Sequence, residues 1–146
     1  MGLKGANVVL AARSLKKLER ISNDIKKNGG SALAVETDLT QENDCENLIN
    51  LTIQNFQTID MLILNAGVSM WAPFEEIEDI SFFNDIMNVN YMGSVYCVHA
   101  ALPELKKSQG KIVSITTAQA IIGFAHHAGY SASKHALHGF LETLDM

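Results

Sequence analysis

Short runs of consecutive apolar residues alternate along the chain with stretches in which apolar residues recur every three or four positions. A continuous apolar run is typical of a strand buried on both faces, and the longer spacing is typical of an amphipathic helix. The runs predict strands at residues 7–13, 31–37, 61–64 and 111–116. The longer spacing predicts helices that begin near residues 15, 40, 80 and 128.

The predicted helices have recognisable ends. Ser14 and Thr40 are the expected N-caps of the first two helices, and Gly29-Gly30 ends the first. The third predicted helix is a long stretch from about residue 80 to 107. In the last predicted helix the apolar spacing continues up to Met146. Alternation of strands and helices favours one doubly wound α/β domain over residues 1–146, with a parallel sheet covered by helices on both faces.

Composition narrows the possible functions. The 146 residues carry a net charge of -5, with 47% hydrophobic and 18% charged residues, as in an ordinary globular domain without a basic surface for nucleic acid. No apolar run approaches the roughly 18 residues that span a bilayer, and the N-terminus has no signal-peptide pattern, so we expect an intracellular chain. Cys45 and Cys97 match no metal or redox spacing and are predicted to be buried free thiols. His126-His127 lacks partners at ligand spacing, so we predict a loop pair at a cleft mouth and no metal site.

The strongest chemical signal is the pair Tyr130 and Lys134. Residues four apart on a helix lie one turn apart on the same face. A tyrosine is a poor proton donor or acceptor at neutral pH, and a cation held one turn away favours its phenolate form. The pair therefore has the chemistry of a proton-transfer unit.

Three motifs follow one another in a recognisable order: Leu64-Asn-Ala-Gly67, Asn88-Val-Asn90 and Gly129-Tyr-Ser-Ala-Ser-Lys-His-Ala-Leu. Over nearly its whole length the chain resembles the short-chain dehydrogenase/reductase family. The last motif is particularly similar to the membrane-associated branch of that family, which handles steroids, retinoids and other lipid carbonyls. The resemblance implies a Rossmann-type doubly wound sheet and reversible hydride transfer between NADP(H) and an apolar carbonyl or alcohol substrate.

The resemblance also implies roles for the polar residues of these motifs. Tyr130 would be the general acid in reduction and the general base in oxidation. Lys134 would bond the nicotinamide ribose and act on the tyrosine, and Asn90 would hold the lysine through a water and complete a proton relay. Thr117 occupies the position of the family's catalytic serine, thirteen residues before the tyrosine.

A second group of residues is implied to contact the cofactor. Arg13, with Ser14 beside it, resembles the basic site that accepts the 2′-phosphate of NADP, which makes NADP(H) the expected cofactor in preference to NAD(H). Asp38-Leu39 resembles the pair that contacts the adenine. Asn65, Ala66 and Gly67 resemble the segment that steadies the central sheet and lines the cofactor cleft.

Each of these residues also has an ordinary structural explanation. In this explanation Tyr130 is an aromatic residue on the helix surface beside a solvated lysine, and residues 65–67 form a turn at the end of a strand. Asn90 is then a helix-kink residue that bonds the backbone, Arg13 a strand-end charge, and Asp38 a helix cap.

The chain departs from the family pattern in two ways. The glycine-rich turn Thr-Gly-x-x-x-Gly-x-Gly and the strand before it do not occur in the sequence, and the region beyond the last helix is also missing. Thr117 stands for serine, and Ala120 stands for a frequent glycine. We therefore expect a partial NAD(P)-binding Rossmann domain without the first βα unit and the C-terminal strands.

Three function classes are compatible with this sequence. The first is a working oxidoreductase, and the second is a catalytically silent truncated product. The third is a dimerisation module that forms a homo-oligomer through the long helix and the catalytic helix. The resemblance implies endoplasmic reticulum membrane association for a full-length form.

Overall fold

A computed structural model describes residues 2–144. The strands within this range are β1 (Asn7–Ala12), β2 (Ser31–Glu36), β3 (Met61–Leu64) and β4 (Lys111–Ser114). The α-helices are α1 (Leu15–Lys27), α2 (Glu42–Phe56), α3 (Ser81–Met87), α4 (Gly93–Ser108) and α5 (Ala128–Glu142). The 3₁₀ turns are η1 (Gly2–Lys4), η2 (Phe74–Glu76) and η4 (Ala118–Ala120), and η3 (Asn88–Met92) is π-helical.

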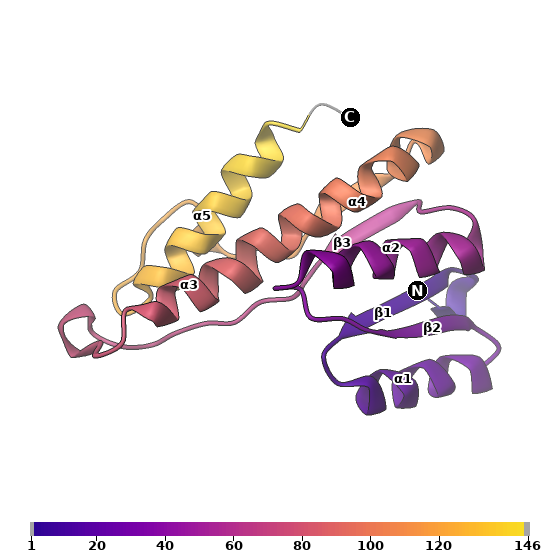
Figure 1. Ribbon diagram of the computed structural model, residues 1–146, viewed down its shortest axis with the longest axis horizontal. Helices are drawn as coiled ribbons and strands as arrows, with labels where there is room; N and C mark the ends of the chain where they lie inside the picture. Colours follow the sequence, from indigo (N-terminus) through magenta and orange to yellow (C-terminus); the bar gives the residue numbers. More distant parts are fainter. Residues whose placement is uncertain (1, 145–146) are drawn as a thin grey trace.

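The strands form two parallel pairs. β1 pairs with β2 from Asn7↔Ser31 to Ala12↔Glu36, and β3 pairs with β4 from Met61↔Lys111 to Leu64↔Ser114. Within residues 2–144 the pairs are separate two-stranded sheets. α1 lies on one side of the β1–β2 pair and α2 on the other (Figure 1). The predicted α/β Rossmann architecture is confirmed, with the sheet divided between β1 and β3.

The apolar core joins the two pairs on one face. Its larger cluster combines side chains from β2, β3, α2, α4 and α5: Val35, Leu64, Cys45, Leu48, Cys97, Val98 and Leu137. The smaller cluster consists of Ile49, Ile59, Ala101 and Leu105. Cys45 and Cys97 are buried free thiols, as predicted. A hydrogen bond with Cys45, together with burial, raises the pKa of the Cys97 thiol.

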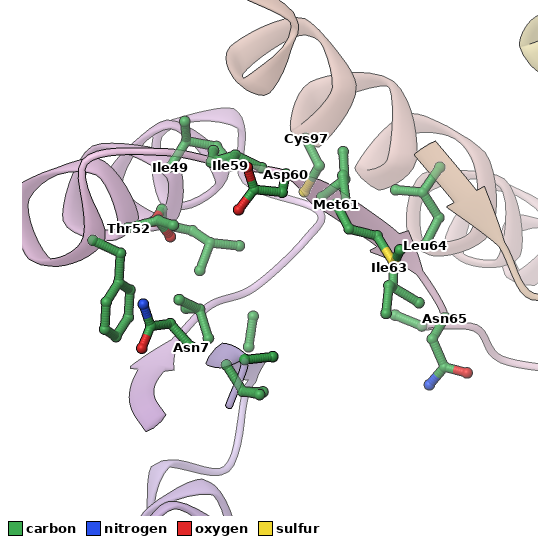
Figure 2. A pocket seen from close by; sticks show the side chains of 18 of the residues that line it. Asn7, Ile49, Thr52, Ile59, Asp60, Met61, Ile63, Leu64, Asn65 and Cys97 are labelled. Carbon is green, nitrogen blue, oxygen red and sulfur yellow. The ribbon is translucent and has the colours of Figure 1, made fainter. Parts of the chain in front are cut away.

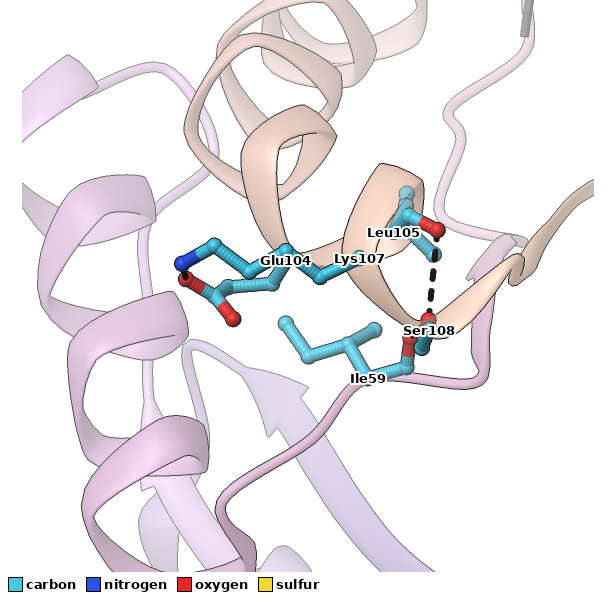
Figure 3. A network of polar contacts seen from close by, with 5 residues as sticks. All are labelled: Ile59, Glu104, Leu105, Lys107 and Ser108. Carbon is cyan, nitrogen blue, oxygen red and sulfur yellow. Dashed lines mark hydrogen bonds and ion pairs between the residues drawn. The ribbon is translucent and has the colours of Figure 1, made fainter.

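Polar contacts fix the far end of α4 against the segment before β3. The Ser108 hydroxyl donates to the carbonyl oxygens of Ile59 at 2.7 Å and of Leu105 at 3.2 Å (Figure 3). The neighbouring pair Lys107–Glu104, at 2.6 Å, lies on the helix surface. Ser108 therefore satisfies a carbonyl of the last turn of α4 and ties that turn to the segment entering β3.

The predicted long helix is present with an irregular centre. α3, η3 and α4 follow one another without a break, and η3 contains Asn90. At the start of α4, a Cβ built on Gly93 would lie 2.7 Å from Cβ of Leu39 and 2.8 Å from its carbonyl oxygen. Glycine at this position lets the helix approach the backbone that follows β2.

Several predicted boundaries are wrong by one or two residues. Three strands end earlier than predicted, β1 at Ala12, β2 at Glu36 and β4 at Ser114. Ser14 is the N-cap of α1 as predicted, but its side chain makes no cap bond; its carbonyl accepts from Lys17 and Leu18. The N-cap of α2 is Gln41, because Thr40 bonds the Asp38 carboxylate instead.

The last helix ends earlier than its apolar pattern predicts. α5 ends at Glu142, and the Thr143 hydroxyl donates to the Phe140 carbonyl at 2.7 Å. The predicted continuation through Met146 extends outside the described residues. No helix in residues 2–144 has both the length and the apolar character needed to cross a membrane.

The strand ends bring distant polar residues to one edge. β1, β2 and β3 all run in the same direction, so their carboxyl ends lie on the same side of the molecule (Figure 1). The backbone amide of Thr37 donates to the carbonyl of Ala12 at 3.1 Å, and that of Ile115 donates to the carbonyl of Leu64 at 2.9 Å. The loops that leave these strands therefore start side by side.

Candidate active site at the strand ends

Asn90 is the central polar residue of this edge. Its side chain is fully buried, at 0% exposure. Oδ1 accepts from the backbone amide of Val68 at 2.8 Å, while Nδ2 donates to the Val68 carbonyl at 2.9 Å and to Oγ of Ser133 at 2.9 Å. One amide thus joins the loop after β3, the π-helical segment and α5, and both of its polar atoms are satisfied.

Ser133 continues the network toward the tyrosine. Its hydroxyl accepts from Asn90 and donates to the backbone carbonyl of Tyr130 at 2.8 Å. Ser133 is fully buried and is not among the residues selected from the sequence. Its place one turn after Tyr130, on the buried side of the helix, is the signal that would have identified it.

Lys134 is an almost fully buried cation, at 4% exposure. Its Nζ donates to the carbonyl of Ile115 at 3.5 Å and lies 5.8 Å from the centre of the Tyr130 ring. Burial lowers the pKa of Lys134 below its ordinary value, because the ammonium form loses hydration. An ammonium has three donors, and the single long bond leaves capacity for further acceptors.

Gly67 connects this network with the loop after β3. A Cβ built on it would lie 3.3 Å from Oδ1 of Asn90 and 3.6 Å from Nζ of Lys134. Asn65, Ala66 and Gly67 are exposed, so solvent reaches the bare backbone at this point. The structure therefore brings Asn90, Lys134 and this segment together. Because residue 67 has no side chain, a flat polar group could approach Asn90 and Lys134 through the space that a Cβ would occupy.

Thr117 lies at the start of η4. Its hydroxyl oxygen accepts from the backbone amide of Gln119 at 3.5 Å, and η4 packs against α5. The residue is partly buried and stands beside the helix that carries Tyr130 and Lys134.

The residues predicted to contact the adenosine end lie after β1 and β2. Arg13 and Ser14 are exposed, and Asp38 and Leu39 are partly buried. The amide and hydroxyl of Thr40 donate to Oδ1 of Asp38 at 3.0 and 2.9 Å. These bonds, with a smaller contribution from the charge of Arg13, hold the pKa of Asp38 below its ordinary value. Asp38 orders the turn before α2 rather than capping the helix itself, because α2 begins only at Glu42.

An aromatic cluster borders Tyr130. Trp71 lies 5.5 Å from the ring of His126 and 4.8 Å from that of His127, and His127 lies 6.0 Å from the ring of Tyr130. The amide of Ala72 donates to the carbonyl of His126 at 3.0 Å, which holds the two loops together. Sequence spacing gave no indication of Trp71, because loop residues with no shared periodicity form this contact. No group of three or more metal-ligating side chains occurs in the described part of the chain.

The side chains at the two ends of this edge could hold the two ends of a dinucleotide. The buried, under-bonded Lys134 ammonium and the bare Gly67 suit the ribose end, and Arg13 suits a phosphate at the other end. The printed sequence has no glycine-rich turn that could supply backbone amides to a pyrophosphate between them.

Comparisons with known proteins identify the family of the chain. The family model described as short chain dehydrogenase matches residues 1–146. The chain is 42% identical over 142 residues to 11-beta-hydroxysteroid dehydrogenase-like 2 of Arabidopsis thaliana, covering 97% of the chain and 46% of that relative. It is 34% identical to the dehydrogenase/reductase SDR family protein 7-like of Dictyostelium discoideum, covering 96% of the chain and 46% of that relative. The chain thus spans about half the length of the curated relatives it matches.

Solved structures share the fold. An alcohol dehydrogenase from Thermococcus sibiricus, complexed with 5-hydroxy-NADP, superposes with a TM-score of 0.92 at 23% identity, over 97% of this chain and 60% of that one. A putative short-chain alcohol dehydrogenase from Sinorhizobium meliloti superposes with a TM-score of 0.86 at 26% identity, over 95% of this chain and 55% of that one.

The burial of Lys134 predicts a stability effect that depends on pH. Lys134→Met should raise the free energy of unfolding at about pH 7 by about 1–3 kcal/mol, because a poorly bonded buried cation is replaced by an apolar chain. Between the lowered folded-state pKa and the ordinary lysine value of about 10.4, the unfolded chain binds more protons, so the parent gains stability as pH rises. The advantage of the variant should therefore shrink toward about pH 10.

Urea unfolding followed by circular dichroism at several pH values measures this difference. Lys106→Met, at an exposed position on α4, is the matched control and should change stability little at any pH. A Lys134→Met variant that is less stable than the parent at neutral pH contradicts the assignment of Lys134 as an under-bonded cation.

Proposed function

The chain belongs to the short-chain dehydrogenase family, and on that premise we propose that it contributes the proton-transfer site of an oxidoreductase acting on an apolar carbonyl or alcohol with NADP(H). The observation that carries the proposal is the Asn90 amide. It fixes the loop after β3 to Ser133, and Ser133 in turn holds the backbone of Tyr130. Tyr130 and Lys134 therefore have one defined position relative to the exposed Gly67 backbone.

The residues would divide the work as follows. Tyr130 gives a proton to the substrate oxygen during reduction and takes one back during oxidation. Lys134 stabilises negative charge on the phenol oxygen and bonds the ribose of the cofactor. Thr117 orients the substrate oxygen through its hydroxyl, and Asn90 positions the loop and the helix and completes the proton relay. When bound, NADP(H) would supply or accept the hydride.

The cofactor preference rests on Arg13. It is an exposed guanidinium at the carboxyl end of β1, where an acidic residue would favour NAD(H). Arg13 and Ser14 would hold the 2′-phosphate, and Asp38 and Leu39 would contact the adenine. Asn65, Ala66 and Gly67 would line the cleft between the adenosine end and Lys134.

An apolar substrate is supported by the surroundings of Tyr130. Trp71, with 74% of its surface exposed, stands against His127 at the tyrosine. Ile121 and Ile122, in the segment that leads from η4 to α5, are also exposed. The relatives named as 11-beta-hydroxysteroid dehydrogenase-like proteins support a steroid, retinoid or other lipid as substrate.

The divided sheet favours a second candidate, a catalytically silent module. The chain spans about half the length of its relatives, and the sequence has no pyrophosphate-binding turn. Such a module would form a homo-oligomer through α4 and α5, and a longer form would associate with the endoplasmic reticulum membrane. Activity of the residues in a completed protein distinguishes this candidate from the first.

Replacing Tyr130 tests the proposed proton transfer. The test protein is a chimera in which residues 1–146 replace the matching segment of the Arabidopsis 11-beta-hydroxysteroid dehydrogenase-like 2 protein. Tyr130→Phe should lower kcat by about 10²- to 10⁴-fold, with nearly unchanged affinity for NADPH, because it removes only the proton donor. Steady-state rates with NADPH and a panel of apolar ketones measure the loss. Tyr96→Phe, on α4, is the control; equal rates for both variants exclude Tyr130 as the acid.

Reversing the charge at position 13 tests the cofactor preference. In the same chimera, Arg13→Asp should shift the ratio of kcat/KM for NADPH over NADH by at least about 100-fold toward NADH, since a carboxylate repels the 2′-phosphate and accepts from the ribose hydroxyls. Arg20→Asp, an exposed position on α1, should leave the ratio unchanged. If the parent chimera uses both cofactors equally, Arg13 does not select the phosphate.

A further inference from the structure

A sulfur atom ties the loop after β3 to the beginning of α5. The backbone amide of Gly129 donates to Sδ of Met70 at 3.2 Å, although the two residues are 59 positions apart in the chain. Met70 is buried, at 7% exposure, and Gly129 is buried as well. Gly129 directly precedes Tyr130, so this contact lies in the first turn of the helix that carries the proposed proton donor.

The Gly129 amide needs an acceptor because of its place in the helix. The first amides of an α-helix have no carbonyl partner within the helix, and the side chain of the N-cap residue often supplies one. His127 is the N-cap of α5, and its side chain makes no cap hydrogen bond. Packing leaves little room for a water, since a Cβ built on Gly129 would lie 3.0 Å from Phe83 and 3.2 Å from Ile86. The Met70 thioether, a weak acceptor, therefore takes the place of the N-cap side chain.

The two ends of the loop after β3 have different surroundings. Asn65, its first residue, lies at the cavity of about 780 Å³ that is lined by β1 and β3 (Figure 2). Three hydrogen-bonded contacts hold the later part of the loop against α5 and its neighbours: Val68 with Asn90, Met70 with Gly129 and Ala72 with His126. At Met70 the loop contributes a side chain, and in the other two contacts it contributes backbone groups. A substitution can therefore remove the Met70 contact alone.

We propose that Met70 is a positioning residue for Tyr130, and that its sulfur fixes the first turn of α5 in the orientation from which the phenol transfers a proton. The inference rests on the proposed function of Tyr130 and adds a residue that acts on it through the backbone of Gly129. Proton transfer requires the two oxygens to lie within about 2.6–3.2 Å of each other. A misplacement of about 1 Å at a catalytic group can cost about 100-fold in rate, so a first turn that shifts or frays slows the reaction.

A buried methionine can also simply fill space, and the two roles predict different orders among variants. Met70→Leu keeps the apolar volume and removes the acceptor. Met70→Gln keeps the length of the side chain and offers a carbonyl oxygen as acceptor, but it also buries an amide nitrogen. If Met70 only fills space, Met70→Leu is the more active variant. If its sulfur holds Gly129, Met70→Gln is the more active one.

Steady-state kinetics of the chimera described above distinguishes these roles. Met70→Leu should lower kcat for the apolar ketones by about 5- to 20-fold and leave KM and the affinity for NADPH within about twofold, because it affects the proton donor and not binding. The ratio of kcat in H₂O to kcat in D₂O should rise, since a slower proton transfer limits turnover more strongly. Met70→Gln should restore kcat to within about threefold of the parent. The proposal is overturned if Met70→Leu is as active as the parent or more active than Met70→Gln.

Met87→Leu is the matched control. It makes the same change at a partly buried methionine of α3 and should leave kcat and KM unchanged. Circular dichroism verifies that all three variants fold. An equal loss of kcat in Met87→Leu and Met70→Leu would show a general response to changes in the core and would overturn the proposal.

Hydrogen exchange tests the contact without any turnover. In the 146-residue chain, exchange of the Gly129 amide, followed by NMR, should become at least about fivefold faster in Met70→Leu, while the amides of β4 stay unchanged. Unchanged exchange at Gly129 overturns the proposal even if the chimera is active. The two failures are distinguishable. A Tyr130→Phe chimera as active as the parent overturns the proposed function, whereas the exchange of Gly129 shows directly whether Met70 holds this turn.

Discussion

The buried amide of Asn90 is the interaction on which the candidate site depends. A buried amide costs several kcal/mol unless its donors and acceptor find partners. Here the partners are the amide and carbonyl of Val68 and the hydroxyl of Ser133, which belong to two segments more than 60 residues apart in the chain. Satisfying one side chain thus forces the loop after β3 and helix α5 into a single arrangement. The π-helical segment η3 is the local irregularity that presents Asn90 to both.

The second constraint is the division of the sheet. Arg13 stands after one pair of strands, and Asn65 and Lys134 stand with the other pair. The core on the α2 and α4 face holds the pairs together, while β1 and β3 do not pair with each other in the described residues. The residues proposed for proton transfer therefore lie within one half of the molecule. The residues proposed to contact the cofactor are spread over both halves.

Much of this arrangement could be predicted from the sequence, because its signals are local. Apolar runs located the strands of residues 2–144 to within two residues, and family motifs selected Tyr130, Lys134, Asn90 and the segment at Gly67, which the structure places close together. The family itself is confirmed by the comparisons. Ser133, Trp71 and the Val68 backbone could not be selected, because their roles arise from tertiary contacts between segments with no shared period. Thr40 does not cap α2 because its hydroxyl bonds the Asp38 carboxylate. α5 ends before the apolar spacing of its sequence does, because that spacing indicates which residues are buried and not where a helix ends.

The most direct measurement is the free energy of unfolding of Asn90→Leu against that of Asn88→Leu, both by urea titration at about pH 7. The same chemical change is made at a buried and at an exposed residue of the π-helical segment. At position 90 it removes the hydrogen bonds to Val68 and Ser133 and leaves the amide and carbonyl of Val68 without these partners. The loss there should exceed that at position 88 by at least about 2 kcal/mol, up to complete unfolding. Equal stability of the two variants would contradict the central role of the Asn90 amide.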